Sequence, residues 1–235
     1  FRFHPASFLT LKGNWGRYYR LPTFFELFGN LGSVTGDNEL EHEKGLNRDI
    51  GVTFSTGRFL FFDRPFLEAV YLSNEVENLI LFFPNSQSTV KPKNIGSATI
   101  RGFELSLAFS ILESINLSGN YCYLDGKDTS PIPYYNGNSL AGRPLHQAAF
   151  QIEFDKTRWR AAYELHYIGS NYLDRANMKE LPARKIHNLS LNLRHPGRRV
   201  TLAIEAQNLG DNQVSDVSGF PLPGRSFYTT IRLKI

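Results

Sequence analysis

The chain has 235 residues, of which 14% are aromatic and 20% are charged, and its formal net charge is +4. No stretch approaches the ~18 consecutive apolar residues of a membrane-spanning helix, which excludes helical membrane proteins but not β-barrels, whose strands need only ~9 to 11 alternating residues. The basic residues are scattered rather than gathered into a stripe, so the sequence predicts no nucleic-acid partner, and the lone Cys122 excludes an internal disulfide.

Apolar and polar side chains alternate with a period of two along most of the chain, which predicts ten β-strands, while helical periodicity is almost absent. In chain order the predicted strands span residues 8–20, 46–56, 66–80, 96–110, 113–125, 145–155, 158–172, 184–194, 198–209 and 224–235. The segment FELSLAF (103–109) is typical, with large apolar residues on one face and small or polar residues on the other. In a soluble protein the apolar face packs on a core, whereas in an outer-membrane barrel it contacts lipid.

The connections between these strands alternate between short and long. Short turns are predicted at 55–58, 111–114, 155–158 and 195–198, and long irregular stretches at 21–45, 81–95, 126–144, 173–183 and 210–223. Because every second connection of an up-and-down sheet lies at the same end, all short turns are expected at one end and all long loops at the other. Transmembrane barrels show this asymmetry, and Greek-key sandwiches have no reason to. The sequence therefore predicts an all-β fold, a transmembrane antiparallel up-and-down β-barrel.

Tyrosines gather towards the strand ends that adjoin the long loops. This arrangement fits an aromatic girdle at a membrane interface, and it fits equally well the general preference of tyrosine for strands. The residues concerned are Tyr18, Tyr19, Tyr121, Tyr123, Tyr163, Tyr167 and Tyr172.

Six segments, in the same order along the chain, resemble the TonB-dependent outer-membrane receptors, a family that imports iron siderophores, cobalamin and related nutrients. They are NWGRYYRLPTFFELFGN (14–30), NELEHEKGLNRDIGV (38–52), EAVYLSNEVENLI (68–80), NIGSATIRGFELSLAFS (94–110), LSGNYCYLDG with LAGRPLHQAAFQIEF (117–126 and 140–154), and IEAQNLGDNQVSDVSGFPLPGRSFYTTIRLKI (204–235). The resemblance implies a barrel of about 22 strands around a plug domain, in the outer membrane of a Gram-negative bacterium.

Two departures from the family pattern shape the expected domain organisation. Ten strands are fewer than half of such a barrel, and no segment resembles the plug, so residues 1–235 are expected to form the C-terminal portion of the barrel domain without its plug. The family usually ends in an aromatic residue, whereas this chain ends in Ile235, so the ending is expected to be a variant or to lack further residues. The opening FRFHPASFL shows no export signal, so the start is expected to have been processed or to be missing.

Candidate ligand-binding residues lie in the long loops and at the loop ends of strands. Aromatic rings there are suited to stacking on a macrocyclic or aromatic ligand, and arginines are suited to an anionic ferric chelate. The candidates are Phe82, Phe83, Tyr134, Tyr135, Tyr172, Arg20, Arg143 and Arg175. The alternative for the rings is packing or interface anchoring, and for the arginines it is salt bridging, with an architectural role for Arg143.

No catalytic or metal-binding constellation emerges from the spacing of the six histidines, so the sequence predicts no enzyme, no cofactor and no metal site. The expected function is uptake of a scarce nutrient, a ferric siderophore or a cobalamin-like ligand, with outer-membrane lipid, the small-molecule ligand and TonB, reached through a plug domain, as partners. Two alternatives stay open. One is a self-closed ten-stranded outer-membrane barrel acting as a passive pore or an enzyme, and the other is a soluble β-sheet binding module.

Overall fold

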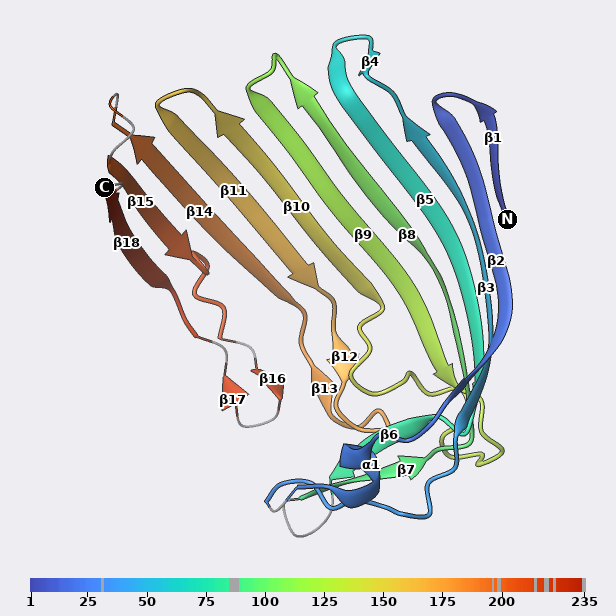
Figure 1. Cartoon of the computed structure of the whole chain (residues 1–235). Helices are drawn as coiled ribbons and strands as arrows, with labels where there is room; N and C mark the ends of the chain where they lie inside the picture. Colours follow the sequence, from blue (N-terminus) through green and yellow to red (C-terminus); the bar gives the residue numbers. More distant parts are fainter. Residues whose placement is uncertain are drawn as a thin grey trace.

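A single large antiparallel sheet dominates the computed structural model, which describes residues 1–30, 32–84, 89–195, 197, 200–213, 215–217, 220–221 and 223–233 (Figure 1). Neighbouring strands follow one another in chain order, so the sheet is an up-and-down meander. Its strands are β1 (Arg2–Ala6), β2 (Leu9–Arg20), β3 (Glu43–Ser55), β5 (Phe62–Glu77), β8 (Ser97–Ile111), β9 (Ile115–Asp128), β10 (His146–Asp155), β11 (Trp159–Ile168), β14 (Arg184–Arg194), β15 (Val200–Gln207) and β18 (Ser226–Leu233).

Smaller elements decorate this sheet. The short strand β4 (Arg58–Phe59) pairs with β5. Three separate hairpins and one helical turn lie in the long connections: β6 (Ile80–Pro84) with β7 (Val90–Asn94), β12 (Asn171–Tyr172) with β13 (Glu180–Leu181), β16 (Ser215–Val217) with β17 (Phe220–Pro221), and α1 (Phe24–Phe28). Within the described ranges, no helix has the length and apolar character needed to cross a membrane.

All ten predicted strands are present, and the all-β antiparallel fold is confirmed. The predicted strand 66–80 is wrong at its end, because Asn78 has a positive φ of 56°, which ends β5 at Glu77 and starts β6 at Ile80. The predicted strand 158–172 is also too long, since β11 stops at Ile168 and the chain then enters the β12–β13 hairpin. Strand β1, helix α1 and the small hairpins were not predicted, and residues 196, 198, 199, 234 and 235 of predicted elements lie outside the described residues.

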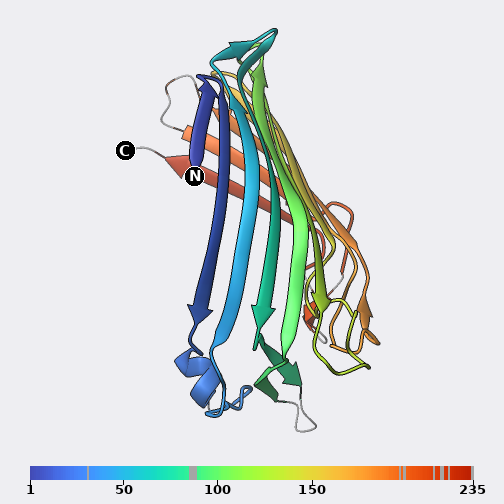
Figure 2. The same cartoon turned by 90° about the vertical axis from the view of Figure 1, so that its right-hand side faces the viewer.

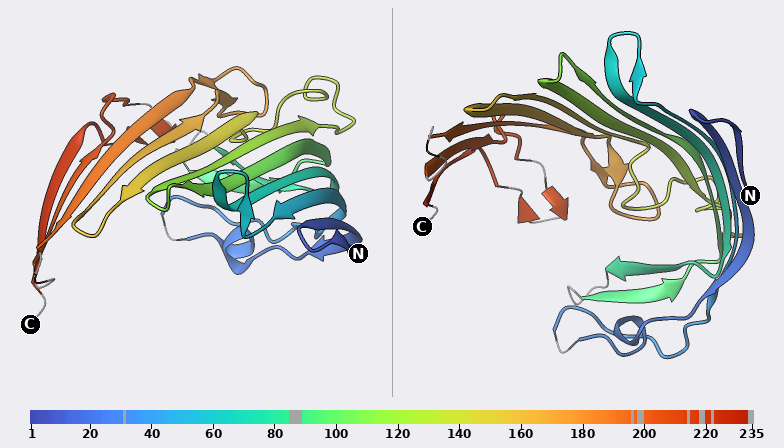
Figure 3. Two further views of the ribbon diagram at one scale, coloured as in Figure 1. Left: turned by 90° about the horizontal axis from the view of Figure 1, so that it is seen from above. Right: turned by 45° about the horizontal axis from the view of Figure 1, so that its top comes forward.

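Short turns and long loops lie at opposite ends of the sheet, as the sequence predicts (Figure 1). The 111–114 turn is tight, because Ile111 pairs with Ile115 and the chain reverses through Leu112 and Glu113, which both have positive φ, 51° and 57°. The turn predicted at 55–58 is longer than expected, since the chain continues into β4 before it reverses. The strands lie side by side and curve into an open arc, and the loops of the long end gather on its concave side (Figures 2 and 3).

The apolar face of the sheet is its convex face, and strand register continues it from strand to strand. Phe103 lies between Tyr71 of β5 and Tyr123 of β9. No described segment forms a second layer over this face, and Trp15 and Ile50 keep 71% and 60% of their surface exposed. So large an apolar surface is unfavourable in water and is matched by lipid. The soluble-module alternative requires a covering layer, which the described part of the chain does not supply.

The concave face carries paired polar side chains. Lys12 Nζ lies 2.8 Å from Glu68 Oε2, and the same carboxylate accepts a hydrogen bond from Thr53 Oγ1 at 2.8 Å. Near the short turns, Asp155 lies within 3.2 Å of guanidinium nitrogens of Arg160 and Arg194. Charges on this wall therefore largely neutralise one another across strands, as a polar barrel interior requires.

A triple anchor holds the first long loop against this face. Arg20, the last residue of β2, donates to Glu26 of α1 at 3.0 and 3.1 Å and to Glu43 of β3 at 2.7 Å. Glu43 in turn accepts the backbone N–H of Ile80 at the start of β6, at 2.9 Å. Thr23 and Glu26 also form a reciprocal capping box around α1. Arg20 therefore joins the ends of two strands to two loop elements.

We expect Gly102→Ala to weaken barrel assembly. A Cβ on Gly102 would lie far inside contact distance of the backbone carbonyl of Tyr123, which cannot rotate away. Overpacking of this kind costs about 1–3 kcal/mol. The measurement is the fraction of folded, fast-migrating protein on unheated gels over a urea series. Gly119→Ala is the control, because its Cβ would meet its nearest atom at an ordinary 3.4 Å, and equal midpoints for the two variants would contradict the argument.

The loop anchor should loosen in acid. Burial opposes ionisation of Glu26, but hydrogen bonds from Arg20 and Thr23 more than offset it and lower the pKa of its carboxyl. A lowered pKa means that the carboxylate stabilises the fold above its ordinary value of about 4.3, and that this stabilisation is lost as the pH falls through the lowered value. Hydrogen exchange in residues 21–42, corrected for intrinsic rates, should therefore accelerate below pH ~4. In Glu26→Gln this step should vanish, and identical profiles for the two proteins would refute the assignment.

Candidate functional site

Three long connections enclose a cleft of about 470 Å³ at the loop end of the sheet. The β6 strand supplies one wall, the 135–142 segment a second, and the 173–176 segment a third. Four of the eight predicted ligand-binding residues line this cleft: Phe82, Phe83, Tyr135 and Arg175. The structure therefore brings together side chains that are up to 93 positions apart in sequence, between Phe82 and Arg175.

The two phenylalanines of β6 have different environments. Alternation along the strand turns Phe83 towards the small apolar core formed by Ile95, Ala98 and Leu140, where it is half-buried. Phe82 faces the other way, remains 41% exposed, and lies with its ring centroid 5.9 Å from that of Phe25. Phe82 is thus the ring better placed to meet a ligand, and Phe83 mainly holds the hairpin on the sheet.

Arg175 is the centre of the cleft's polar network. Its Nε donates to Asp128 at 2.6 Å, and its Nη2 donates to Ser130 Oγ and to the Ile95 carbonyl, both at 2.8 Å. The guanidinium carbon also lies 4.2 Å from the ring centroid of Tyr135. The side chains of Arg175 and Asp128 are only 14% and 1% exposed. The charge of Arg175 is therefore offset by a buried carboxylate, and its chief effect is to join three loops.

The other four candidates lie outside the cleft lining. Tyr134 is exposed, packs edge-on against Tyr135 at 5.1 Å, and donates from its hydroxyl to Met178 Sδ at 3.6 Å. Tyr172 is half-buried in β12, where its carbonyl accepts the N–H of Gly142 at 2.7 Å. Arg143 is exposed beside the cleft, and Arg20 is held by two carboxylates at the loop anchor. Ligand contact by these four stays a prediction.

Two residues that sequence reasoning missed hold the loops around the cleft in place. Asp174 accepts backbone N–H groups of Ala176 at 3.1 Å and Lys179 at 2.6 Å, which folds the 173–179 loop into a compact turn. Asn177, at a positive φ of 56°, exchanges hydrogen bonds with the backbone of Ser139 at 2.8 and 2.9 Å. The segment DRANM (174–178) contained a signal for this turn, because Asp and Asn side chains commonly accept or donate hydrogen bonds to the backbone of the turn in which they lie.

The cleft has the features of a small-molecule site. Its walls are apolar and aromatic, with one arginine and one aspartate. Across the described ranges, no three His, Cys, Asp or Glu side chains lie close enough together to hold a metal ion.

Arg175→Ala should loosen the loops around the cleft. The substitution leaves the buried carboxylate of Asp128 without its cation, which costs about 3 kcal/mol or more for a buried pair. Hydrogen exchange should rise in residues 129–145 and 173–179 and stay unchanged in β10 and β11. Arg143→Ala is the matched control, and adding Asp128→Asn to Arg175→Ala should restore part of the protection. Equal protection in both single variants would show that the pair does not hold the loops.

Residues 1–209 match the family model described as TonB dependent receptor-like, beta-barrel. Among curated proteins, the chain is 24% identical over 242 residues to the vitamin B12 transporter BtuB of Photobacterium profundum, covering 99% of this chain and 36% of that protein. It is 27% identical over 177 residues to an iron-regulated outer membrane virulence protein of Vibrio cholerae, covering 69% of this chain and 26% of that protein. The matched parts of the chain thus span only 36% and 26% of the length of these two relatives.

Solved structures show the same fold. The copper transporter OprC superposes with a TM-score of 0.77 at 20% identity, over 100% of this chain and 38% of OprC. The siderophore receptor PiuA of Acinetobacter baumannii superposes with a TM-score of 0.74 at 20% identity, over 98% of this chain and 34% of PiuA. The family-model match, which covers most of the chain, and the meander sheet with its loops sorted to one end agree. The chain belongs to the TonB-dependent receptors of the Gram-negative outer membrane and supplies part of their β-barrel.

Proposed function

We propose that the receptor containing this chain imports a scarce nutrient, with a ferric siderophore as its ligand. The observation that carries this proposal is the cleft at the loop end, where the exposed ring of Phe82, the Tyr135 ring and Arg175 converge. A wall of this composition suits a large, partly aromatic chelate, because the aromatic groups of the ligand can stack on the rings of the wall. Since Arg175 is already bonded to Asp128, the cleft offers few further hydrogen bonds, and apolar contact would supply most of the binding.

A cobalamin-like ligand is the second candidate. The match to a relative named as a vitamin B12 transporter favours it, and so does the same apolar wall, which would meet a macrocycle face. The neutralised state of Arg175 also fits a ligand without strong negative charge. The two ligand classes therefore differ in whether an exposed cation at the cleft rim, Arg143, contributes to binding.

The proposal assigns residues 1–235 to the C-terminal portion of the barrel domain, so that the plug and its contact with TonB come from elsewhere in the receptor. This chain would contribute barrel wall, lipid contact and surface loops. A receptor or transporter role without enzymatic activity follows from the same assignment. A self-closed pore or enzyme is less well supported, because β1 and β18 are not paired with each other in the described sheet and open strand edges are costly in lipid.

Phe82→Ala combined with Tyr135→Ala should weaken ligand binding to the receptor. Each ring contributes roughly 0.5–1.5 kcal/mol of stacking, so the pair should raise the Kd about tenfold. Quenching of intrinsic fluorescence by ferric enterobactin, ferric yersiniabactin and cyanocobalamin, tested separately on the detergent-purified receptor, measures this. Phe28→Ala is the control, because Phe28 is an exposed loop ring that stacks on Phe24 outside the cleft. Binding that is unaffected by the double variant would place the ligand elsewhere.

A growth assay separates the two ligand classes. A strain lacking the receptor should lose growth on one of these compounds as sole iron or cobalamin source, and Arg143→Gln should reduce binding of an anionic ferric chelate but not of cyanocobalamin. No growth defect on any of the three compounds would reject both candidates.

A further inference from the structure

The short helix α1 presents large apolar side chains that no described segment covers. Phe24 and Phe28 are 84% and 68% exposed, and their rings stack with centroids 6.1 Å apart. Leu21, just before the helix in sequence, is 76% exposed. These three side chains are called the α1 patch below. Large apolar side chains exposed together are typical of an interaction site.

The α1 patch is held in place by contacts on both sides of the helix. Arg20 binds Glu26, whose capping box closes the first turn, and the Asp37 N–H donates to the Glu26 carbonyl at 2.9 Å. On another face of the helix, Phe25 packs against Phe82 with ring centroids 5.9 Å apart. A surface that is fixed before docking loses little conformational entropy when a partner covers it.

Neither lipid nor the ligand cleft accounts for the α1 patch. The helix lies on the concave side of the sheet, whereas lipid contacts the convex face (Figure 3). The cleft lining includes Phe82 but none of the three side chains of the patch. The one acidic residue of the helix, Glu26, is neutralised by Arg20. The patch is therefore uncharged, and it fits an apolar protein segment.

The edge of the sheet beside α1 has unpaired backbone groups. Phe1 exchanges two backbone hydrogen bonds with Gly13 of β2, at 2.6 and 3.1 Å. Beyond this pair β2 continues to Arg20, and no described strand lies on that side of it. In an antiparallel strand, alternate residues turn both backbone groups towards the same neighbour. Every second residue from Trp15 to Tyr19 therefore presents its N–H and C=O at the open edge.

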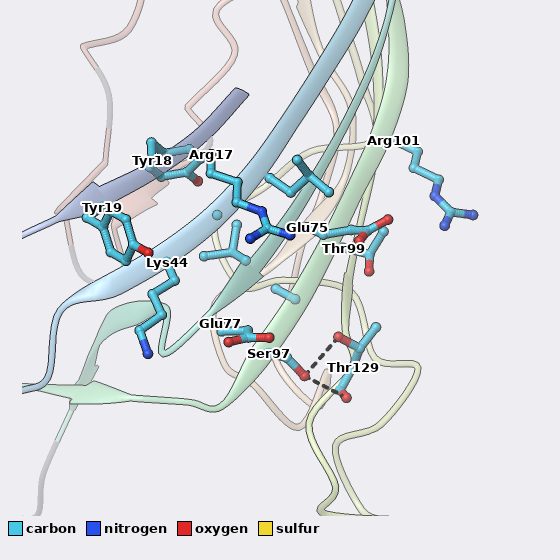
Figure 4. Close-up of a pocket in the computed structure, with 14 residues that line it drawn as sticks. Arg17, Tyr18, Tyr19, Lys44, Glu75, Glu77, Ser97, Thr99, Arg101 and Thr129 are labelled. Carbon is cyan, nitrogen blue, oxygen red and sulfur yellow. Dashed lines mark hydrogen bonds between the residues drawn. The ribbon is translucent and has the colours of Figure 1, made fainter. Parts of the chain in front are cut away.

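Strand register determines where an upstream strand would leave the sheet. Because Phe1 pairs with Gly13, a strand that continues β1 upstream would pair with the rest of β2 as far as Arg20. Lipid favours this pairing, since unpaired backbone groups are costly there. The strand would then leave the sheet at the loop end. Figure 4 shows this end of β2, where Tyr19 and Lys44 of β3 line a hollow of about 570 Å³.

The position of this exit brings the preceding connection close to α1. Only residues 21–23 separate the end of β2 from α1, and the helix lies below β2 at the open edge of the sheet (Figure 2). Since a short turn joins β1 to β2, the connection before β1 belongs to the loop end, where the long connections lie. The solved and curated relatives that match this chain are much longer than it is.

We propose that the α1 patch is the docking surface for the long connection that precedes β1 in the whole receptor. Apolar side chains of that connection cover Leu21, Phe24 and Phe28, so that two long loops are joined above the edge of β2. The inference rests on the proposed assignment of residues 1–235 to the C-terminal portion of the barrel domain. It adds a specific contact between loops, which strand pairing alone does not require.

Photo-crosslinking of the detergent-purified full-length receptor tests the proposal. When p-benzoylphenylalanine replaces Phe24, irradiation should join it to the connection that precedes β1, and mass spectrometry of a digest locates the joined residues. The same amino acid in place of Tyr134, an exposed aromatic residue of another long loop, is the control and should not crosslink to that connection. Crosslinks from position 24 to the plug domain, to lipid or to no protein segment would overturn the proposal.

A second measurement follows the mobility of the docked connection. Leu21→Ala combined with Phe24→Ala removes most of the α1 patch and keeps the contact between Arg20 and Glu26. Hydrogen exchange in the connection that precedes β1 should then rise at least tenfold. In Tyr134→Ala the same connection should exchange as in wild type. Unchanged exchange in the double variant contradicts docking on the patch.

Hydrogen exchange in β2 distinguishes failure of this inference from failure of the barrel assignment. Protected amides at Trp15, Arg17 and Tyr19 in the full-length receptor show that an upstream strand pairs with β2. Protection there, together with crosslinks to another part of the receptor, overturns only the docking of the connection on α1. Rapid exchange at all three amides overturns the barrel assignment as well.

Discussion

Backbone hydrogen bonding between sequential antiparallel strands is the constraint on which the rest of this structure depends. A strand in lipid has no water to satisfy its N–H and C=O groups, so each must pair with a neighbour. The ladder from β2 to β15 meets that requirement in unbroken chain order, with one register irregularity, beside Asp63 and Phe66 in β5. Because every strand pairs with the next and short connections alternate with long ones, the short turns lie at one end of the sheet and the long loops at the other. One wall of paired strands therefore carries all the long loops at the same end.

Because of the pleat, the two faces of that wall differ in polarity. Side chains alternate between the two faces, so the same strand register produces the apolar convex surface around Phe103 and the concave surface on which Lys12 and Glu68 form an ion pair. Polar atoms of rings on the convex face are satisfied locally. The hydroxyls of Tyr121 and Tyr163 each lie 2.8 Å from Nδ1 of a histidine two residues off register, His146 and His187. The same geometry occurs in both pairs. In each, the hydrogen bond to the tyrosine hydroxyl satisfies the ring nitrogen and makes it tolerable next to lipid.

Besides the small apolar core of Ile95, Ala98 and Leu140, a few arginine–carboxylate pairs order the loops. Arg20 with Glu26 and Glu43 fixes the first loop, and Arg175 with Asp128 fixes the loops around the cleft. Such pairs are costly to break from one side, so they specify loop positions sharply. These carboxylates also neutralise Arg20 and Arg175, two arginines that the sequence analysis proposes as contacts for an anionic ligand.

Strand positions, the antiparallel order and the sorting of connections were determined by the sequence itself, because period-two alternation and connection length are local properties of the chain. The positions at which strands are interrupted were not determined in this way. The positive φ of Asn78, which ends β5, leaves no trace in the period-two pattern. Which candidate residues share a site was decided only by tertiary structure. Phe82, Tyr135 and Arg175 come from three loops, and no local pattern shows that they converge or that Asp128 neutralises the arginine. Loop contacts depend on side chains distant in sequence, and only the folded sheet brings them within hydrogen-bonding distance.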